Sequence, residues 1–181
     1  MGTRRDLLKA GGLALASLAV PAGVGADRPV EIRMLSSPRG EHAWFDPIGI
    51  RIAPGQAVRW VMASPGNPHT TTAYHPKNAS HSLRIPEAAA PWDSGFLVEP
   101  GATFEITLQV EGVYDYFCLP HEAAGMVGRI VVGQAGGPGA LPFDYFAGRP
   151  GAQAWLPVPD AARAAFPSVA AILAHGVVRR R

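Results

Sequence analysis

One short segment of the chain carries three side chains that bind soft metal ions. Cys118, His121 and Met126 offer a thiolate, an imidazole and a thioether in the spacing Cys-x-x-His-x-x-x-x-Met. Sulfur ligands favour Cu(I), and two histidines, one cysteine and a weak axial methionine define the blue-copper electron-transfer site. The segment therefore predicts one copper ion per chain, cycling between Cu(I) and Cu(II), if a second imidazole lies nearby.

Two upstream histidines compete to supply that imidazole. His69 follows an Asn-Pro turn, and His75 lies further along the same segment. His75 lies six residues after His69, so if the segment is extended the two are roughly 20 Å apart and cannot both bind one ion. Both would lie on the same face of the segment, and the residues alone leave the choice open. The other histidines, His42, His81 and His175, are expected to be structural or exposed.

Enzyme chemistry fits the same residues poorly. Cys118 is the only cysteine, which excludes a disulfide within the chain and a binuclear copper site built on two cysteines. It lies between Phe117 and Leu119, so the His-Cys-His motif of a multicopper oxidase is absent. It also ends an apolar strand, where a hydrolytic thiolate would need an open position beside a base. We therefore expect a protein without catalytic residues.

The elements that must position these ligands are predicted by period-two apolar patterns. Cys118 ends one such strand and Met126 begins the next, which fixes the loop between them. Short strands between turn signals, without a βαβ pattern, indicate an all-β antiparallel Greek-key sandwich or barrel. The patterns occur at 30–34, 48–52, 58–62, 104–110, 113–118 and 126–132.

The last part of the chain differs from the strand-rich part. Residues 134–181 begin as a Gly/Pro-rich linker and are expected to form a helical C-terminal extension. Helices are predicted at 161–165 and 168–174, with Ser168 as the N-cap of the second and Gly176 as its end. The extension is apolar enough to pack on its own sandwich or on a second copy of the chain.

The first residues indicate export. Residues 1–26 contain Arg4 and Arg5, a short apolar run at 10–20 and small residues just before Asp27. This pattern resembles a twin-arginine export signal. The apolar run is too short to cross about 30 Å of hydrocarbon. We therefore expect a mature protein that starts near Asp27, has no membrane span and lies in the periplasm or otherwise outside the cytoplasm.

Length and charge agree with a single exported domain. The 181 residues suit one domain of residues 27–133 plus the extension. The net charge is +2, and residues 1–26 carry three basic residues against one acidic residue, so the remainder is neutral (+2 − 2 = 0). A neutral domain without a basic face argues against nucleic-acid binding.

The chain resembles the plastocyanin, pseudoazurin and halocyanin group of cupredoxins over about residues 30–133. Its Cys-x-x-His-x-x-x-x-Met spacing is that of plastocyanin and is longer than the amicyanin loop. The connection at 74–91 is longer than in that group, and residues 134–181 have no counterpart in its small members. The resemblance is carried by the segments 54–60, 67–69, 92–95, 100–101, 112–121 and 126–128.

The resemblance implies what the residues alone leave open. It implies an eight-stranded Greek-key sandwich, with His69 rather than His75 as the upstream ligand. It also implies that Asn67 bonds to the ligand loop, although an ordinary turn role is an equal alternative. One-electron transfer between a redox donor and an acceptor is the implied function. A copper carrier or sensor without electron transfer is the alternative.

Docking of those partners is expected near His121, because the loop residues around it are apolar and nearly without charge. We expect the helices of 160–175 to pack away from this face, against the sandwich or a second subunit. A homo-oligomer formed through the extension is possible on this view.

Overall fold

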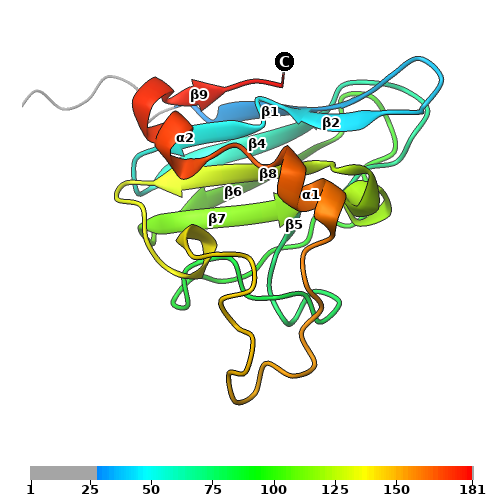
Figure 1. Cartoon of the computed structure of the whole chain (residues 1–181). Coiled ribbons are helices and arrows are strands. Elements are labelled where there is room, and N and C mark those ends of the chain that lie inside the picture. The colour runs from blue at the N-terminus through cyan, green and yellow to red at the C-terminus, as the bar shows by residue number, and fades with distance from the viewer. Residues whose placement is uncertain (1–27, 181) are drawn as a thin grey trace, which may run out of the picture.

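Two facing β-sheets form the body of the protein in a computed structural model that describes residues 28–180 (Figure 1). The first sheet has the order β2-β1-β4-β6, and the second has the order β5-β7-β8-β3-β9. The strands are β1 (Val30–Ser36), β2 (Ala43–Asp46), β3 (Gly49–Ile52), β4 (Gln56–Met62), β5 (Thr72–Ala73), β6 (Thr103–Leu108), β7 (Gly112–Phe117), β8 (Val127–Val132) and β9 (Val177–Val178).

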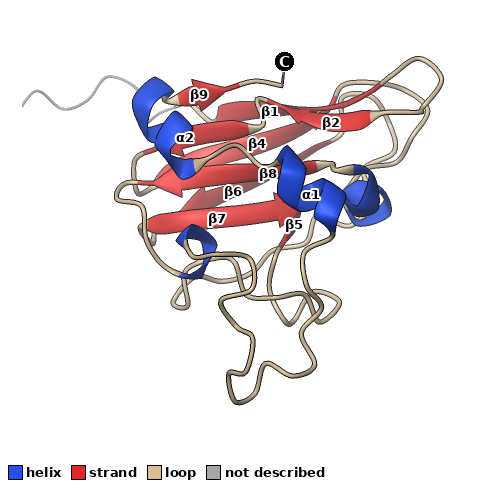
Figure 2. Cartoon of the chain, in the orientation of Figure 1, coloured by secondary structure: helices blue, strands red, loops and turns tan. Residues whose placement is uncertain are grey.

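Short helices lie at one end of the strands and across one sheet (Figure 2). They are the 3-10 helices η1 (Leu119–Ala124) and η2 (Pro138–Ala140) and the α-helices α1 (Asp160–Ala165) and α2 (Val169–His175). No helix within residues 28–180 is both long and apolar enough for a membrane span. The twin-arginine segment predicted at 1–26 lies outside the described residues.

The predicted β-sandwich is confirmed, but its strands are not all antiparallel. β1 pairs with β4, and β3 pairs with β8, in parallel, while the other pairings between named strands are antiparallel. The prediction of antiparallel sheets was therefore wrong in these two pairs. The reason is topological, because parallel neighbours arise where a crossover connection, and not a hairpin, links them.

Alternation of apolar and polar residues builds the core between the sheets. Along β6 the apolar residues point inward and the threonines and Glu105 lie exposed, as the pattern predicted. Trp60, Trp92 and Tyr116 form the centre of the core, with the rings of Trp60 and Tyr116 packed edge to face at 5.3 Å. Tyr116 belongs to the strand that ends at Cys118, so this aromatic packing anchors the ligand-bearing strand.

The outer face of the second sheet is covered by the C-terminal extension. Every residue of β7 and β8 is buried, which means that both faces of these strands are shielded from water. Figure 1 shows α1 and α2 lying across this sheet. Ser168 caps α2 by accepting a hydrogen bond from the backbone of Ala171, and Gly176 ends the helix, as predicted. The extension thus packs on its own sandwich.

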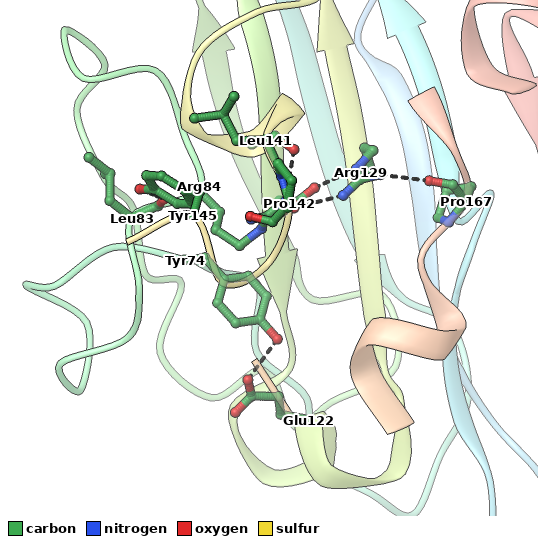
Figure 3. Close-up of polar contacts among 11 residues, drawn as sticks. Tyr74, Leu83, Arg84, Glu122, Arg129, Leu141, Pro142, Tyr145 and Pro167 are labelled. Carbon is green, nitrogen blue, oxygen red and sulfur yellow. Dashed lines mark hydrogen bonds and ion pairs between the residues drawn. The ribbon is translucent and has the colours of Figure 1, made fainter. Parts of the chain in front are cut away.

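A buried ion cluster fastens the extension to the sheet (Figure 3). Asp115 of β7 accepts hydrogen bonds from Arg84 at 2.7 Å and from Arg129 of β8 at 2.6 Å, and all three side chains are almost fully buried. The two guanidinium groups donate further hydrogen bonds to backbone carbonyls of the extension. These acceptors are Gly139, Leu141, Pro142 and Pro167. The rings of Phe143 and Phe166 lie over the same cations.

Candidate metal centre

Three donor side chains meet at the end of the sandwich where β7 stops. His69, Cys118 and His121 place their ligand atoms within 4.8 Å of one another. The sulfur of Cys118 lies 3.6 Å from Nδ1 of His69 and 3.4 Å from Nδ1 of His121. The structure therefore groups two imidazole nitrogens and one sulfur so that they could hold one ion.

His69 is fixed from both sides. Its backbone pairs with that of Leu97, and its Nε2 lies 2.8 Å from the hydroxyl of Ser36 at the end of β1. Since Nδ1 faces Cys118, the ring proton belongs on Nε2, where Ser36 accepts it. Burial, followed by the nearby His121, lowers the pKa of His69 to about 4. The ring is thus neutral at physiological pH, with Nδ1 free to bind a metal.

Cys118 is fully buried and is held by Thr70. The backbone N–H of Thr70 points at the sulfur from 3.4 Å, and the Thr70 hydroxyl accepts a hydrogen bond from the N–H of Leu119 at 2.8 Å. Burial raises the pKa of the Cys118 thiol to about 11. A thiolate therefore needs a cation beside it, and the backbone N–H is already aimed at the developing negative charge.

The ligand turn runs from Cys118 to Met126 and closes on itself. The N–H of His121 bonds to the carbonyl of Cys118 at 3.0 Å, the N–H of Met126 bonds to the carbonyl of His121 at 3.1 Å, and the N–H of Cys118 bonds to the carbonyl of Met126 at 3.0 Å. Met126 is completely buried and immediately precedes β8. His121 is half-buried, and burial lowers its pKa.

The donor set fits copper in both type and spacing. Around one first-row ion with metal–sulfur and metal–nitrogen bonds of about 2.3 and 2.0 Å, neighbouring donors stand roughly 3.5 Å apart. The two sulfur–nitrogen separations match this spacing without any rearrangement. A mixed thiolate and imidazole set suits copper better than magnesium or calcium, which prefer oxygen ligands.

The other predicted residues lie away from this group. His75 faces its own loop, where its Nδ1 accepts a hydrogen bond from the N–H of Lys77 at 3.0 Å. The predicted link from Asn67 to the ligand loop is wrong, because its side chain donates instead to the carbonyl of Gly40 at 3.1 Å. Thr70, three residues later, makes the link to the ligand loop. His42 and His175 are exposed.

Three polar residues of the site were not found from the sequence. Ser36 orients His69, Thr70 holds Cys118, and Glu122 binds two side chains of the 74–91 connection. Ser36 and Thr70 carry no signal of their own in the sequence, since a serine at a strand end and a threonine after a turn are common. Glu122 could have been suspected, because it is the one charged residue in the apolar ligand turn.

The ligand turn leaves an apolar surface around His121. Leu119 is 44% exposed, and Pro120, Ala123 and Ala124 are exposed beside it. Phe96 and Val98 add exposed apolar surface on either side of Leu97, whose backbone pairs with that of His69. The surface expected from the sequence is therefore present.

The placement expected for the C-terminal helices is only half right. α2 packs away from the ligand turn, against Val113 and Val131 of the second sheet. α1 lies against the ligand turn, as Figure 1 shows. Gly125 permits this approach: a Cβ there would lie 3.2 Å from the carbonyl of Ala161, and its φ of 85° favours glycine. The exposed residues around His121 remain uncovered.

Comparison with known proteins places this centre in a family. A family profile described as copper binding proteins, plastocyanin/azurin family, matches residues 33–133. A chloroplastic plastocyanin of Chlamydomonas reinhardtii is 33% identical over 67% of this chain and 77% of its own length. A pseudoazurin of Methylorubrum extorquens is 29% identical over 71% of this chain and 77% of its own.

Other relatives match in part or by structure. A halocyanin of Natronomonas pharaonis is 35% identical over 49% of this chain, and the match spans about half (47%) of the halocyanin. A solved pseudoazurin structure from a Sinorhizobium species superposes with a TM-score of 0.51 at 27% identity, over 76% of this chain and 89% of that one.

The fold, the donor group and the comparisons agree. The family profile covers more than half of the chain and contains the three grouped donors at 69, 118 and 121. The two open sheets are those of the cupredoxin fold. Because the family binds copper, copper is the metal that the group takes. This chain is a blue-copper cupredoxin that belongs to the plastocyanin/azurin family of copper-binding proteins.

Proposed function

We propose that this protein carries single electrons between redox partners outside the cytoplasm and is not an enzyme. The observation that carries the proposal is the buried His69–Cys118–His121 group, whose donors already stand at the spacing of a bound ion. A site that needs little rearrangement between oxidation states suits electron transfer. The half-buried His121 links this buried group to the surface.

Four residues of the chain hold the metal on this proposal. Nδ1 of His69, the sulfur of Cys118 and Nδ1 of His121 would bind it, and the thioether of Met126 would be a fourth, weaker donor. Support for Met126 comes from its complete burial and from the backbone bonds that tie it to Cys118 and His121. Bound copper supplies the one-electron couple, and the protein keeps water out and the donors in place.

Electrons enter and leave through the ring of His121. The exposed apolar residues around it suit a brief encounter, because redox complexes commonly bury less than about 1,200 Å² and separate quickly. A redox donor and an acceptor would both use this surface. An oligomer formed through residues 134–181 remains a prediction.

The exported location rests on residues 1–26. The twin arginine, the short apolar run and the small residues before Asp27 support an export signal, followed by a cupredoxin domain at 27–133 and the extension at 134–181. N-terminal sequencing of the protein purified from its producing cells would check the cleavage position.

An optical spectrum and voltammetry of the copper-loaded mature protein test the function. We expect an intense visible absorption from charge transfer between the Cys118 thiolate and copper, and a reversible one-electron couple. Cys118→Ser should abolish the colour, and a Cys118→Ser protein that keeps it would refute the assignment. A coloured protein without a reversible couple would instead favour the copper carrier or sensor.

A further inference from the structure

A largely buried carboxylate lies next to His121 in the ligand turn. The side chain of Glu122 is only 12% exposed, and each of its oxygens has its own partner. The hydroxyl of Tyr74 donates to Oε1 at 2.6 Å, and Nε2 of His81 donates to Oε2 at 2.8 Å (Figure 3, for Tyr74). Both partners belong to the 74–91 connection.

His81 is bound as a cation. Its Nδ1 lies 3.0 Å from the carbonyl oxygen of Asn78, and its Nε2 lies 2.8 Å from a carboxylate oxygen of Glu122. Both neighbours are acceptors, so only a ring that carries a proton on each nitrogen satisfies both. Burial lowers the pKa of His81, but the hydrogen bond and charge of Glu122 outweigh it and raise the pKa above its ordinary value. The contact is thus a charge-assisted hydrogen bond.

The two partners are themselves held rigidly. The ring of Tyr74 is completely buried, with ring centres 4.6 Å from Phe117 and 6.0 Å from Phe166 of the extension. The ring of His81 stacks on the same Phe117 ring, with the two ring centres 4.4 Å apart. Phe117 immediately precedes Cys118, so the same aromatic ring supports the ligand strand and both groups that bind Glu122.

The ligand turn needs such support. Residues Leu119–Ala124 form a 3-10 helix in which no residue is completely buried, and helices of this kind have poorer hydrogen-bond geometry than α-helices. The Thr70 hydroxyl ties the start of the turn at Leu119. The Glu122 carboxylate ties its middle, one residue after His121.

We infer that Tyr74 and His81 are positioning residues for electron transfer, which hold His121 in one orientation through Glu122. The inference rests on the proposed function. A ligand turn anchored in this way moves little when the charge of the centre changes, and a small movement favours fast exchange of electrons. Without the anchor the turn is free to shift, and His121 shifts with it.

The test is the rate of electron self-exchange in copper-loaded mature protein, measured by nuclear magnetic resonance line broadening. Tyr74→Phe removes one hydroxyl and keeps the ring. Tyr145→Phe is the matched control, because the Tyr145 hydroxyl also donates one 2.6 Å bond, to the carbonyl of Leu83, but does not contact the ligand turn. We expect Tyr74→Phe to slow exchange about tenfold, because loss of a residue that supports a metal ligand typically lowers activity about 10- to 100-fold. Tyr145→Phe should exchange at the wild-type rate.

A double-mutant cycle separates positioning from general loosening of the fold. Glu122→Met removes both acceptor oxygens and should also slow exchange, and adding Tyr74→Phe to it should have little further effect, because the Tyr74 hydroxyl then has no acceptor left in the ligand turn. A shifted copper absorption in Tyr74→Phe and not in Tyr145→Phe would add support. Wild-type exchange in Tyr74→Phe, or equal slowing by Tyr145→Phe, would overturn the inference. A wild-type protein without colour or a reversible couple would refute the proposed function instead.

Discussion

Burial sets the protonation of the three grouped donors before any metal binds. The pKa of His69 falls to about 4 and that of His121 also falls, both mainly because burial disfavours the cation, whereas burial raises the pKa of Cys118 to about 11. Near neutral pH both imidazoles are therefore already neutral, and the cysteine is still a thiol. Only the thiol has a proton to lose when a metal enters.

Metal binding should therefore release about one proton per ion, and this number should change little between about pH 7 and about pH 8. Zinc is the suitable probe, because it takes thiolate and imidazole ligands without oxidising the thiol. Calorimetry of zinc binding in buffers of different ionisation enthalpy measures the number. Histidines with the ordinary pKa of about 6.5 would instead release additional protons toward the acidic end of this range.

At the residue scale, the metal-binding side chains could be predicted from the sequence, but the residues that hold them in place could not. Cys118, His121 and Met126 share one turn, so their spacing alone brings them together. Ser36 and Thr70 reach their partners across 33 and 48 residues of sequence, and only the folded sandwich makes these contacts. For the same reason the residues alone did not decide between His69 and its neighbour at 75.

At the scale of the strands, one glycine controls how β7 and β8 meet. Gly128 of β8 lies opposite Tyr116 of β7, and the tyrosine ring fills the space where a side chain at 128 would be. Tyr116 is fully buried and lies two residues before Cys118. The close packing of a large ring on a bare backbone therefore fixes the strand that presents the cysteine.

Gly128→Ala should destabilise the protein by about 1–3 kcal/mol, because the new methyl group overlaps the ring of Tyr116. Chemical denaturation measures the loss. Gly136→Ala is the matched control, since nothing lies within 4 Å of a Cβ at that glycine, and it should leave stability nearly unchanged. Equal stability of the two variants would show that the ring of Tyr116 moves aside freely.

The strands could be predicted where alternation was long enough to detect. All six predicted strands are present, but β2, β5 and β9 were missed, and two of these three have only two residues. Both α1 and α2 were predicted, and α2 also with its cap and its end, but the place of α1 was not. That place depends on the close approach that Gly125 permits, which no periodicity in the chain encodes.

At the scale of the whole molecule, the extension completes the buried charge cluster. The cluster of Arg84, Asp115 and Arg129 has a net positive charge and is almost completely shielded from water. Carbonyl groups of the extension accept hydrogen bonds from both arginines and so help to stabilise this charge. Charges in such a place are tolerated only when every group has partners. The extension therefore contributes to the stability of the folded domain and is not a loosely attached tail.

Asp115→Asn should cost about 3–5 kcal/mol of unfolding free energy, because it leaves two buried guanidinium groups without their shared counter-charge. Urea denaturation of the full mature chain would measure it. Asp160→Asn makes the same chemical change in an exposed ion pair with Arg163 and should have almost no effect. A stable Asp115→Asn protein would mean that the backbone carbonyls alone neutralise both arginines.

The pairing of β9 with β3 also affects how the protein is made. Ile50 pairs with Val177, so β3, from the first third of the chain, is synthesised long before its partner strand β9. Until then the edge of β3 is open and can pair with a neighbouring nascent chain. The β7–β8 hairpin can form early, because its contacts are local, but the second sheet closes only after the extension has emerged. Ribosome-bound chains halted before residue 177 would thus carry an unprotected sheet edge, and chaperones that mask such edges would act during synthesis.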